Sequence, residues 1–481
     1  MNDTDHSYLI IDQGGQSSRL LVFDSAGKQR LLLRQQVQTR HSGAGRVEQD
    51  PLELVNSIRK LLDELPAKLG VDFHRLKAVG LVTQRSSLVC WDRHSGEPLS
   101  PVISWQDTRA AGELAQLKLD DEAVADLTGL RPNAHYGASK MRWCLDNLPD
   151  VRQALADDRL ACGPLASYLL FALTRERHFA VDPGNAQRTL LFNLGRRQWD
   201  QDLLGRFAIP EQILPSLQPC ASHFGDLAIG DMALPVRLLN GDQNTAFFGG
   251  GALHEERLYI NAGTGAFIAA PWPESRSAPA GLLKTLVFED TEQRLFVAEG
   301  TVNGAASALE KMSVELGVAD YQQALDQWCR SATDIPLFLN GVGGLGAPYW
   351  RSDFSSGFVN RDSRNPQAAM VAVLESIVFL LVVNLQRLQE AGGNFTEVFI
   401  GGGLSELQGF CQRLADLSAL PVFSSSETEA TARGAVYLLA GQPAGWPQPD
   451  VRYFTPEVNT ELELRFKHWL RAMAEATAVR V

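Results

Sequence analysis

Hydrophobic positions recur along the chain with two different spacings. Short apolar or β-branched runs, such as residues 77–82, 236–240 and 397–400, alternate with longer stretches of helical periodicity. Runs of this length bounded by polar residues are typical of buried strands, and strands that alternate with helices predict α/β layers. The fold class expected from the pattern alone is therefore α/β.

Two helices of the C-terminal half have readable ends. Asn365 followed by Pro366 predicts the start of a long apolar helix, because asparagine caps helices and proline fits their first turn. The glycines at 392 and 393 predict where this helix stops. Residues 426–429, Ser-Glu-Thr-Glu, have the spacing of a capping box and predict a second helix that continues to Leu439.

Two segments far apart in the chain share one pattern of strand, tight glycine turn and strand. The first covers residues 8–24 and the second covers residues 258–269. Repetition of a supersecondary unit indicates an internal duplication. We expect two similarly folded lobes, residues 1–248 and 249–481, joined at a run of three glycines and facing each other across a central cleft.

The composition is that of a globular protein with a large core. Of 481 residues, 45% are apolar and 21% are charged, which excludes a disordered chain. The 56 acidic and 44 basic residues leave a net charge of −12. A chain without an excess of positive charge is not expected to bind a nucleic acid or an anionic membrane surface.

No segment looks like a signal for export or for membrane insertion. The N-terminus carries Asp3 and Asp5 where a signal peptide has positive charge, and the apolar run at 377–383 is shorter than the roughly 20 residues of a membrane span. The six cysteines are dispersed, which favours free buried thiols over disulfides or a metal site. The expected location is the cytoplasm.

The glycine turns of the two hairpins carry candidate phosphate-binding groups. Backbone N–H groups with no side chain in the way can surround phosphate oxygens. A glycine turn is more often only a turn, but its repetition at corresponding positions of both lobes favours a triphosphate site. The candidate residues are Gly14, Gly15, Ser17 and Arg19 in the first turn and Gly263, Thr264 and Gly265 in the second.

A third glycine cluster, residues 401–403, lies between a predicted strand and a predicted helix. Three consecutive glycines are more than a turn requires, since each loses more conformational entropy on folding than other residues do. Their backbone could approach the flat ring of a nucleotide, with Gly402 and Gly403 as the candidate residues. The alternative is an ordinary turn between strand and helix.

Asp242 follows the strand at 236–240 and opens a predicted helix, on the side where the cleft is expected. A carboxylate in that place can accept the proton of a substrate hydroxyl. Together with Asp12 of the first hairpin it could hold Mg²⁺ through water molecules, because this ion uses only one or two carboxylates besides phosphate oxygens. The alternative is that Asp242 only caps its helix.

These segments resemble the FGGY family of carbohydrate kinases nearly from end to end, and within that family the chain is most similar to the branch that acts on glycerol. The resemblance implies a duplicated ATPase fold of the actin, hexokinase and Hsp70 kind, with ATP mainly on the C-terminal lobe and the sugar or polyol deep in the cleft. Besides the hairpins, the matching stretches are residues 47–51, 84–85, 104–109, 185–189, 241–243, 344–350 and 429–435.

The resemblance also implies roles for single residues. Asp242 matches the family's catalytic base, and Asp12 matches its metal-linked carboxylate. The three glycine clusters match the family's two phosphate turns and its adenosine motif. Arg85, Trp105 and Gln243 match positions that contact the hydroxyls and carbon chain of the polyol.

Three departures from the family pattern bear on the substrate and the phosphate turn. Ser86 replaces a glutamate that binds substrate hydroxyls in the glycerol branch, and losing a charged hydrogen-bond partner costs about 1.5–3 kcal/mol, or roughly ten- to a hundredfold in glycerol affinity. The family's pocket tyrosine aligns at His135, with Tyr136 beside it, and either residue could line the pocket or pack only as a loop residue. In the first turn Gly15 and Gln16 replace two threonines, which could loosen the turn while its backbone donors remain.

The expected function is ATP- and Mg²⁺-dependent phosphorylation of a hydroxyl of a small polyol or sugar. A larger substrate such as a pentose, a ketose or a tetritol is the alternative within the family. A non-catalytic nucleotide-binding protein of the actin or Hsp70 kind is the alternative from another class, and ADP release that depends on an added polyol would distinguish the two. A homodimer and a homotetramer both stay open.

A nicotinamide dehydrogenase is a weaker alternative. Residues 341–346 satisfy the pattern G-x-G-x-x-G, which in a dinucleotide-binding fold opens a helix. In this chain the pattern runs into Ala347 and Pro348, which do not easily begin a regular helix. The P-loop pattern G-x-x-x-x-G-K-[ST] does not occur in the sequence.

Overall fold

A computed structural model describes residues 6–318, 320–359 and 365–478, which fall into two compact units. Unit 1 consists of Met1–Ala252, Thr285–Phe296 and Glu429–Gln448. Unit 2 consists of Leu253–Lys284, Val297–Thr428 and Pro449–Val481. The lobes expected at residues 1–248 and 249–481 stay a prediction.

The central sheet of unit 1 is six-stranded. Its strands are β1 (Ser7–Gln13), β2 (Ser17–Asp24), β3 (Gln29–Gln36), β6 (Leu76–Thr83), β14 (Asp226–Ile229) and β15 (Met232–Gly241). Their order is β14-β15-β6-β1-β2-β3, with β1 antiparallel to β2 and with β6 parallel to both β1 and β15. The predicted first hairpin and the strands at 77–82 and 236–240 are confirmed.

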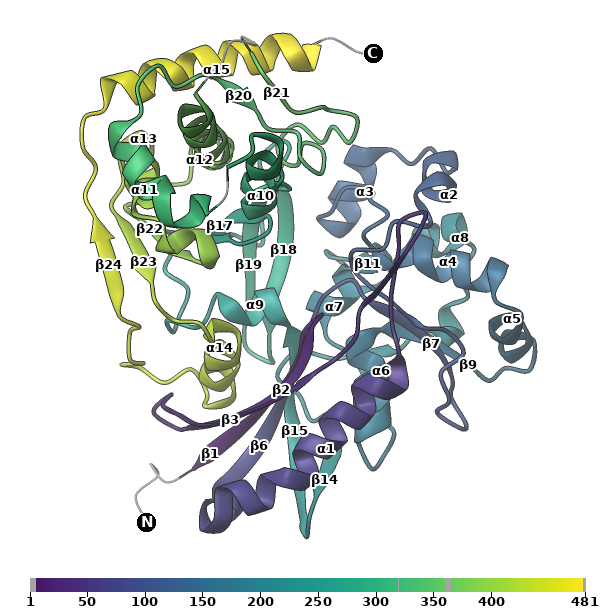
Figure 1. Cartoon of the computed structure of the whole chain (residues 1–481). Helices are drawn as coiled ribbons and strands as arrows, with labels where there is room; N and C mark the ends of the chain where they lie inside the picture. Colours follow the sequence, from purple (N-terminus) through teal and green to yellow (C-terminus); the bar gives the residue numbers. More distant parts are fainter. Residues whose placement is uncertain (1–5, 319, 360–364, 479–481) are drawn as a thin grey trace. The chain divides into compact units, whose positions relative to one another are not determined.

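Helices cover both faces of this sheet. Figure 1 shows α1 (Pro51–Leu69) lying against the sheet, where it contributes to one apolar core with Leu9 and Ile11 of β1. Ile10, the residue between them, faces the opposite side, because successive side chains of a strand alternate between faces. On that side Ile10 and Leu439 of α14 (Ala430–Leu439) both lie against Gly80. Strand β1 is therefore buried along its whole length.

A second sheet in unit 1 carries part of the segments that were expected to hold the substrate, since Trp105 follows its strand β8. Its strands are β4 (Arg40–Ser42), β5 (Arg46–Gln49), β7 (Leu88–Asp92), β8 (Val102–Ile103) and β9 (Leu160–Pro164), in the order β4-β5-β8-β7-β9. The helices of this part are α2 (Ala111–Gln116), α3 (Asp121–Thr128), α4 (Gly137–Asn147), α5 (Pro149–Ala156), α6 (Leu165–Leu173), α7 (Pro183–Gln187) and α8 (Gln201–Phe207). Helix α9 (Asp242–Ala246) follows β15 of the central sheet and contacts β15, β6 and α14. Helix α4 packs against β7 and β9.

The central sheet of unit 2 is seven-stranded, and the tip of its β18–β19 hairpin belongs to unit 1. Its strands are β16 (Arg257–Ala262), β17 (Ala266–Trp272), β18 (Leu283–Glu289), β19 (Arg294–Val302), β22 (Glu397–Gly401), β23 (Val422–Ser425) and β24 (Val451–Phe454). Their order is β18-β19-β17-β16-β22-β23-β24, with β16 antiparallel to β17 and β22 parallel to both β16 and β23. The second predicted hairpin and the strand at 397–400 are confirmed.

The two central sheets repeat one topology. Reading outward from β14, the order β14-β15-β6-β1-β2-β3 matches β24-β23-β22-β16-β17-β19 strand for strand. Both the parallel pairs and the antiparallel hairpins fall at corresponding places. Helix α1 leads into β6, and the long helix α12 (Pro366–Glu390) leads into β22 in the same way. The duplication predicted from two glycine hairpins therefore extends over six strands.

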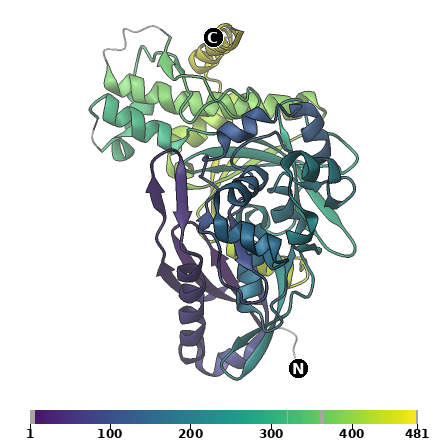
Figure 2. The ribbon, with the colours of Figure 1, turned by 90° about the vertical axis from the view of Figure 1, so that its right-hand side faces the viewer.

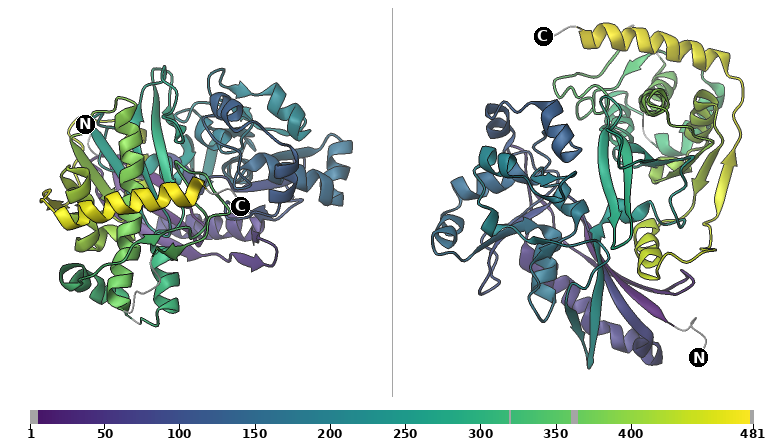
Figure 3. Two further views of the ribbon diagram at one scale, coloured as in Figure 1. Left: turned by 90° about the horizontal axis from the view of Figure 1, so that it is seen from above. Right: turned by 180° about the vertical axis from the view of Figure 1, so that it is seen from behind.

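The helices of unit 2 pack around α12, whose predicted ends are confirmed. The side chain of Asn365 accepts hydrogen bonds from the N–H groups of Gln367 and Ala368, and the helix ends just before Gly392. Figure 2 shows α12 alongside α10 (Ala306–Glu315), α11 (Tyr321–Ser331) and α13 (Gln408–Ser418). In both views of Figure 3, α15 (Thr460–Ala478) forms the outer layer of this unit.

Helix α12 is longer than the apolar run at 377–383 suggested. It has 25 residues and is long and apolar enough to cross a bilayer by length and composition. Its most apolar stretch is, however, completely buried within unit 2. Helices that are apolar on all sides also form the cores of large globular units.

The structure overturns the predicted capping box at residues 426–429 and decides the interpretation of the glycine pattern at 341–346. The capping box predicted at residues 426–429 is wrong, because α14 begins at Ala430 without a side-chain cap and the hydroxyl of Ser426 donates to a distant carbonyl instead. The glycine pattern at 341–346 lies in turns and does not open a helix. The dehydrogenase alternative therefore has no structural support.

All six cysteines are free thiols, as expected. Five of them are buried, and Cys329 is partly exposed. Cys90 and Cys162 face each other across the antiparallel pair of β7 and β9, with their sulfur atoms 3.2 Å apart.

Candidate active site

The first hairpin of unit 1 places a carboxylate and a guanidinium opposite each other. Asp12 on β1 is the cross-strand partner of Arg19 on β2, and the two side chains form an ion pair. Arg19 also pairs with Glu429 at the start of α14, at 2.7 Å. Burial raises the pKa of the Asp12 carboxyl, and the charge and hydrogen bond of Arg19 oppose that shift. The sequence reasoning placed Glu429 in a capping box and in the family stretch 429–435, and gave it no role in the site.

The first glycine turn is held in place through its carbonyl groups. The side chain of Gln13 donates to the carbonyl of Gly14, and the side chains of Thr39 and Gln49 donate to that of Gly15. In a trans peptide the carbonyl and the following N–H point in opposite directions. The N–H groups of Gly15 and Gln16 therefore point away from these side chains, while Ser17 is buried at the start of β2.

The second glycine turn, in unit 2, has the same arrangement. The carbonyl of Gly263 accepts the N–H of Ala306, and the carbonyl of Thr264 accepts the N–H groups of Ala305 and Ser307, at 3.0–3.1 Å. These bonds fasten the turn to the N-terminal end of α10. The N–H groups of Thr264 and Gly265 consequently point the other way.

The third glycine cluster lies next to the second turn in unit 2. Gly402 has a φ of 89°, and a side chain there would collide with the carbonyl oxygen of Ala262 at 2.7 Å. A Cβ atom on Gly403, in contrast, would meet nothing within 4 Å. The backbone of Gly403 therefore faces open space, as a site that receives a flat ring or a phosphate requires.

Asp242 is the first residue of α9 and not its N-cap, because the cap position is occupied by Gly241. Its carboxylate accepts the N–H of Gln243 at 2.7 Å. Burial raises the pKa of Asp242 to about 6, with the nearby positive charge of Arg85 lowering it and the negative charge of Asp12 raising it. The negative charge of Asp12 acts on the pKa of Asp242, so the two carboxylates lie near each other within unit 1.

Arg85 fastens the segment after β6 to α9. Its guanidinium donates to the side chains of Gln243 and Asn244, the latter at 2.7 Å. Its aliphatic stem lies on Gly241, where an added Cβ would come within 2.5 Å of it. The structure therefore brings Arg85, Asp242 and Gln243 together, and it adds Asn244, which the sequence reasoning missed.

Three rings form a small aromatic group in unit 1. The rings of Trp105 and His135 are 5.7 Å apart, and those of His135 and Tyr136 are 5.2 Å apart, both edge to face. Trp105 is 39% exposed, whereas Tyr136 is buried. Burial and then the positive charges of Lys140, Arg188 and Arg85 lower the pKa of His135 well below its usual value, so that the imidazole is neutral.

Ser86 has an unusual backbone conformation and an unsatisfied hydroxyl. Its φ is 63°, in the left-handed region that non-glycine residues rarely adopt. The hydroxyl oxygen is buried and has no hydrogen-bond partner among the described residues. Ser86 occupies the position where the family pattern has a glutamate, so this position carries no charge.

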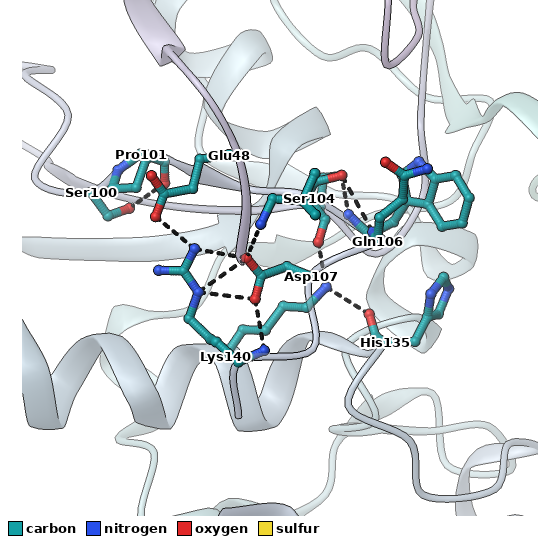
Figure 4. A network of polar contacts seen from close by, with 12 residues as sticks. Glu48, Ser100, Pro101, Ser104, Gln106, Asp107, His135 and Lys140 are labelled. Carbon is teal, nitrogen blue, oxygen red and sulfur yellow. Dashed lines mark hydrogen bonds and ion pairs between the residues drawn. The ribbon is translucent and has the colours of Figure 1, made fainter. Parts of the chain in front are cut away.

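Figure 4 shows a network of polar contacts beneath these residues. The carboxylate of Asp107 accepts the N–H of Val47 at 2.6 Å and pairs with Arg109, which also pairs with Glu48. Lys140 of α4 lies in the same network and is completely buried. The sequence reasoning did not identify Lys140, because the sequence around a single lysine on a helix does not indicate that its side chain is buried.

The residues present fit a magnesium ion that is held mainly by phosphate. Within residues 6–318, 320–359 and 365–478, no group of three or more His, Cys, Asp or Glu side chains could hold a metal ion by itself. Asp12 and Asp242 lie near each other in unit 1, and Glu429 pairs with Arg19 next to Asp12. Mg²⁺ characteristically uses one or two carboxylates, several waters and the substrate's phosphate oxygens.

The chain is similar to known glycerol kinases over nearly its whole length. The glycerol kinase of Albidiferax ferrireducens is 32% identical over 493 residues, which cover 98% of this chain and 97% of the relative. The glycerol kinase of Limosilactobacillus reuteri is 29% identical and covers 97% of each chain.

Solved structures show the same fold. A glycerol kinase of Plasmodium falciparum with ADP superposes with a TM-score of 0.88 at 23% identity, over 99% of both chains. A xylulose kinase of Rhodospirillum rubrum superposes with a TM-score of 0.86 at 19% identity, over 98% of this chain and 99% of the other. At these identities the likeness shows the fold alone.

Two family models cover most of the chain. The N-terminal domain of the FGGY family of carbohydrate kinases matches residues 7–249, and its C-terminal domain matches residues 258–441. The chain therefore belongs to the FGGY family of carbohydrate kinases, with their duplicated actin-like ATPase fold, and it is an ATP-dependent kinase that phosphorylates a polyol or sugar.

Proposed function

We propose that Asp242 is the general base for the reacting hydroxyl of a small polyol or ketose that binds in unit 1. The observation that carries this proposal is the raised pKa of about 6 for a carboxylate that lies beside Arg85 and Gln243. A base works best when its pKa lies near the operating pH, since it is then mostly deprotonated and still basic enough to take a proton.

The chemical step follows from these residues. The carboxylate of Asp242 takes the hydroxyl proton while the alcohol oxygen forms a bond to the γ-phosphorus of ATP. The bond from that phosphorus to the bridging oxygen breaks, and ADP leaves with the electron pair. Transfer of this kind needs positioning and charge neutralisation more than covalent catalysis.

We further propose that Asp12 and Asp242 hold Mg²⁺ through water. When bound, the ion supplies positive charge at the phosphate oxygens. Asp12 can do this only in its charged form, and Arg19 favours that form by pairing with it. Arg19 also contributes positive charge close to the turn at Gly14 and Gly15.

The glycine clusters are the proposed nucleotide-binding groups. The N–H groups of Gln16, Thr264 and Gly265 are turned away from the bonds that fasten their turns, which is the orientation that phosphate oxygens need. The open space beside Gly403 suits the adenosine. Gly14, Ser17, Gly263 and Gly402 support the same turns.

The acceptor is proposed to bind between Arg85, Gln243 and the aromatic group of Trp105, His135 and Tyr136. Relatives at 29–32% identity are glycerol kinases, which favours a polyol. Ser86 lacks the charge that would bind glycerol hydroxyls, which favours a larger acceptor such as a pentose, a ketose or a tetritol. We therefore expect glycerol to be a poor substrate. The non-catalytic actin-like alternative is set aside, since the chain is a carbohydrate kinase.

A panel of three- to six-carbon polyols and ketoses, assayed with MgATP by coupled ADP release, tests this proposal. We expect ADP release to depend on the added acceptor and to be faster with a four- or five-carbon acceptor than with glycerol. Release that is independent of every acceptor would contradict the proposed acceptor site. Glycerol as the best acceptor would contradict the role given to Ser86.

A further inference from the structure

Lys140 is a fully buried lysine that uses every donor it has. Its Nζ donates to the carbonyl oxygens of Ser86 at 3.1 Å, Ser104 at 2.7 Å and His135 at 2.8 Å. An ammonium group has three N–H donors, so the three carbonyls account for all of them. The side chain has no exposed surface, and it is therefore out of reach of a bound substrate.

Each of the three carbonyls belongs to a segment that carries a residue of the proposed acceptor site. Ser86 directly follows Arg85, Ser104 directly precedes Trp105, and His135 is a member of the aromatic group itself. These segments are separate in the chain and lie in three different loops, and Figure 4 shows two of the three bonds. One buried ammonium therefore ties together the backbone of all three sides of the site.

The bond to Ser86 fixes a conformation that the chain would not adopt by itself. Left-handed backbone is unfavourable for serine, and it persists only where the surroundings hold it. The hydroxyl of Ser86 contributes nothing to this, since it has no partner among the described residues. The hydroxyl of the next residue, Ser87, accepts the N–H of Trp105 at 3.1 Å and so links the same two segments a second time.

The buried surroundings of Lys140 disfavour its charged form, so the charge itself does not stabilise the fold. Burial lowers its pKa to about 7, with Asp107 raising it and Arg109 lowering it further. A lysine whose pKa falls on burial is less stable as an ammonium than it would be in water. An apolar residue of the same size would avoid that cost but would leave the three carbonyls without this donor, so satisfying these carbonyls is what requires an amine at this position.

We propose that Lys140 is a positioning residue of the acceptor site, whose ammonium holds the segments of Arg85–Ser86, Trp105 and His135 in the arrangement that binds the polyol or sugar. This inference rests on the acceptor site proposed above. It concerns the acceptor and not the nucleotide, because the segments that Lys140 ties contain none of the three glycine clusters.

Deprotonation of Lys140 removes one of three donors and should loosen the site at alkaline pH. The titratable and charged groups around this part of α4 are Asp107 and Arg109 after β8, Glu48 on β5, Cys90 on β7, His135 before the helix and Cys144 on it. The pKa values of both thiols are raised well above their usual value, and that of His135 is lowered well below its own. Asp242 of the same site has a pKa of about 6, so the change is assigned to Lys140 by its loss in the variant Lys140→Met.

The variant Lys140→Met tests the proposal, with Lys68→Met, an exposed lysine of α1, as the matched control. Michaelis constants are measured for glycerol, for D-xylulose and for ATP. We expect the KM of the acceptor to rise about tenfold, which corresponds to one lost hydrogen-bonded contact, while the KM of ATP changes less than about twofold. In the wild type the KM of the acceptor should rise with pH above about 7, and in Lys140→Met this dependence should be absent.

Amide hydrogen exchange gives a readout that needs no acceptor. Exchange, corrected for the intrinsic rate at each pH, should become faster in residues 84–88, 104–109 and 133–138 of the variant and should stay unchanged elsewhere. If the variant does not fold, the same measurement on the wild type between pH 6 and 10 decides the question. Unchanged exchange in these segments, or an unchanged KM of the acceptor, would overturn the role of Lys140. Failure of ADP release with every acceptor, in contrast, would contradict only the proposed function.

Discussion

Arg19 lies directly across the β1–β2 hairpin from Asp12, and its guanidinium ion-pairs with the Asp12 carboxylate. The pair opposes the effect of burial, which raises the pKa of the Asp12 carboxyl and favours its protonation. The negative charge of Asp12 in turn raises the pKa of Asp242. The hairpin therefore carries a glycine turn and also influences the pKa of the proposed base, Asp242.

This coupling predicts the pH dependence of the kinase. Asp242 must be deprotonated to accept a proton, so kcat/KM for the acceptor should rise with pH through about 6, before deprotonation of Lys140 above about pH 7 raises KM. Replacing Asp12 by Asn removes a charge that raises the pKa of Asp242, so the rise should move to lower pH in the activity that remains. The measurement is kcat/KM for the acceptor between pH 4.5 and 8 at saturating MgATP.

Asp24→Asn is the control for this experiment, because Asp24 lies at the far end of the same hairpin and pairs with Arg30. Its pH profile should match that of the wild type. A profile of Asp12→Asn that also matches the wild type would show that Asp12 does not act on the titrating group.

Asp242→Asn should abolish phosphoryl transfer while the protein stays folded. Asparagine has nearly the same size but cannot take a proton, and loss of a general base lowers rates by roughly 10²–10⁴-fold. The side chain makes one local hydrogen bond, to the N–H of Gln243, so the melting temperature should change little. ADP release and nucleotide binding are measured side by side, with Asp231→Asn at the start of β15 as the control. A fully active Asp242→Asn enzyme would exclude Asp242 as the base.

The parts of the fold that depend on local pattern were predictable from the sequence. Both hairpins and the ends of α12 follow from glycine, asparagine and proline at positions where backbone geometry demands them. The capping box at 426–429 failed because the carboxylate of Glu429 is drawn to Arg19, more than 400 residues away in the sequence. A local motif gives no information about such a distant partner.

Only part of the candidate site was predictable from local pattern. Asp12, Arg85 and Asp242 were found because they stand at the ends of strands or in motifs of the family. Lys140 and Asn244 act through contacts with segments remote in the chain. Such contacts are set by tertiary packing, which periodicity and spacing do not report.

Ser86→Glu should improve the use of glycerol. The substitution restores a charged acceptor beside Arg85, which is worth about 1.5–3 kcal/mol to a hydrogen-bonded hydroxyl, so the KM of glycerol should fall roughly ten- to a hundredfold. The left-handed backbone at this position is equally unfavourable for both residues, so it does not bias the comparison. Steady-state kinetics with glycerol are measured against those with D-xylulose, together with the melting temperature.

Ser86→Gln separates the effect of charge from that of size. Glutamine has the shape of glutamate without its charge, and it should improve glycerol use much less. Equal improvement by both variants would assign the effect to size, and a folded Ser86→Glu enzyme with unchanged glycerol kinetics would show that Ser86 does not limit this substrate.

Gly403→Ala should weaken ATP binding without weakening the fold. The added methyl group meets no atom of the protein within 4 Å, so it enters the open space in which we expect the nucleotide. We expect the KM of ATP to rise by about tenfold, as for the loss of about 1.4 kcal/mol of binding energy, while the KM of the acceptor and the melting temperature stay the same. Gly357→Ala on β21 (Gly357–Phe358) is the matched control, since its methyl group also meets nothing within 4 Å and it lies outside the glycine clusters. If both alanine variants bind ATP equally well, the open backbone at Gly403 is not where the nucleotide lies.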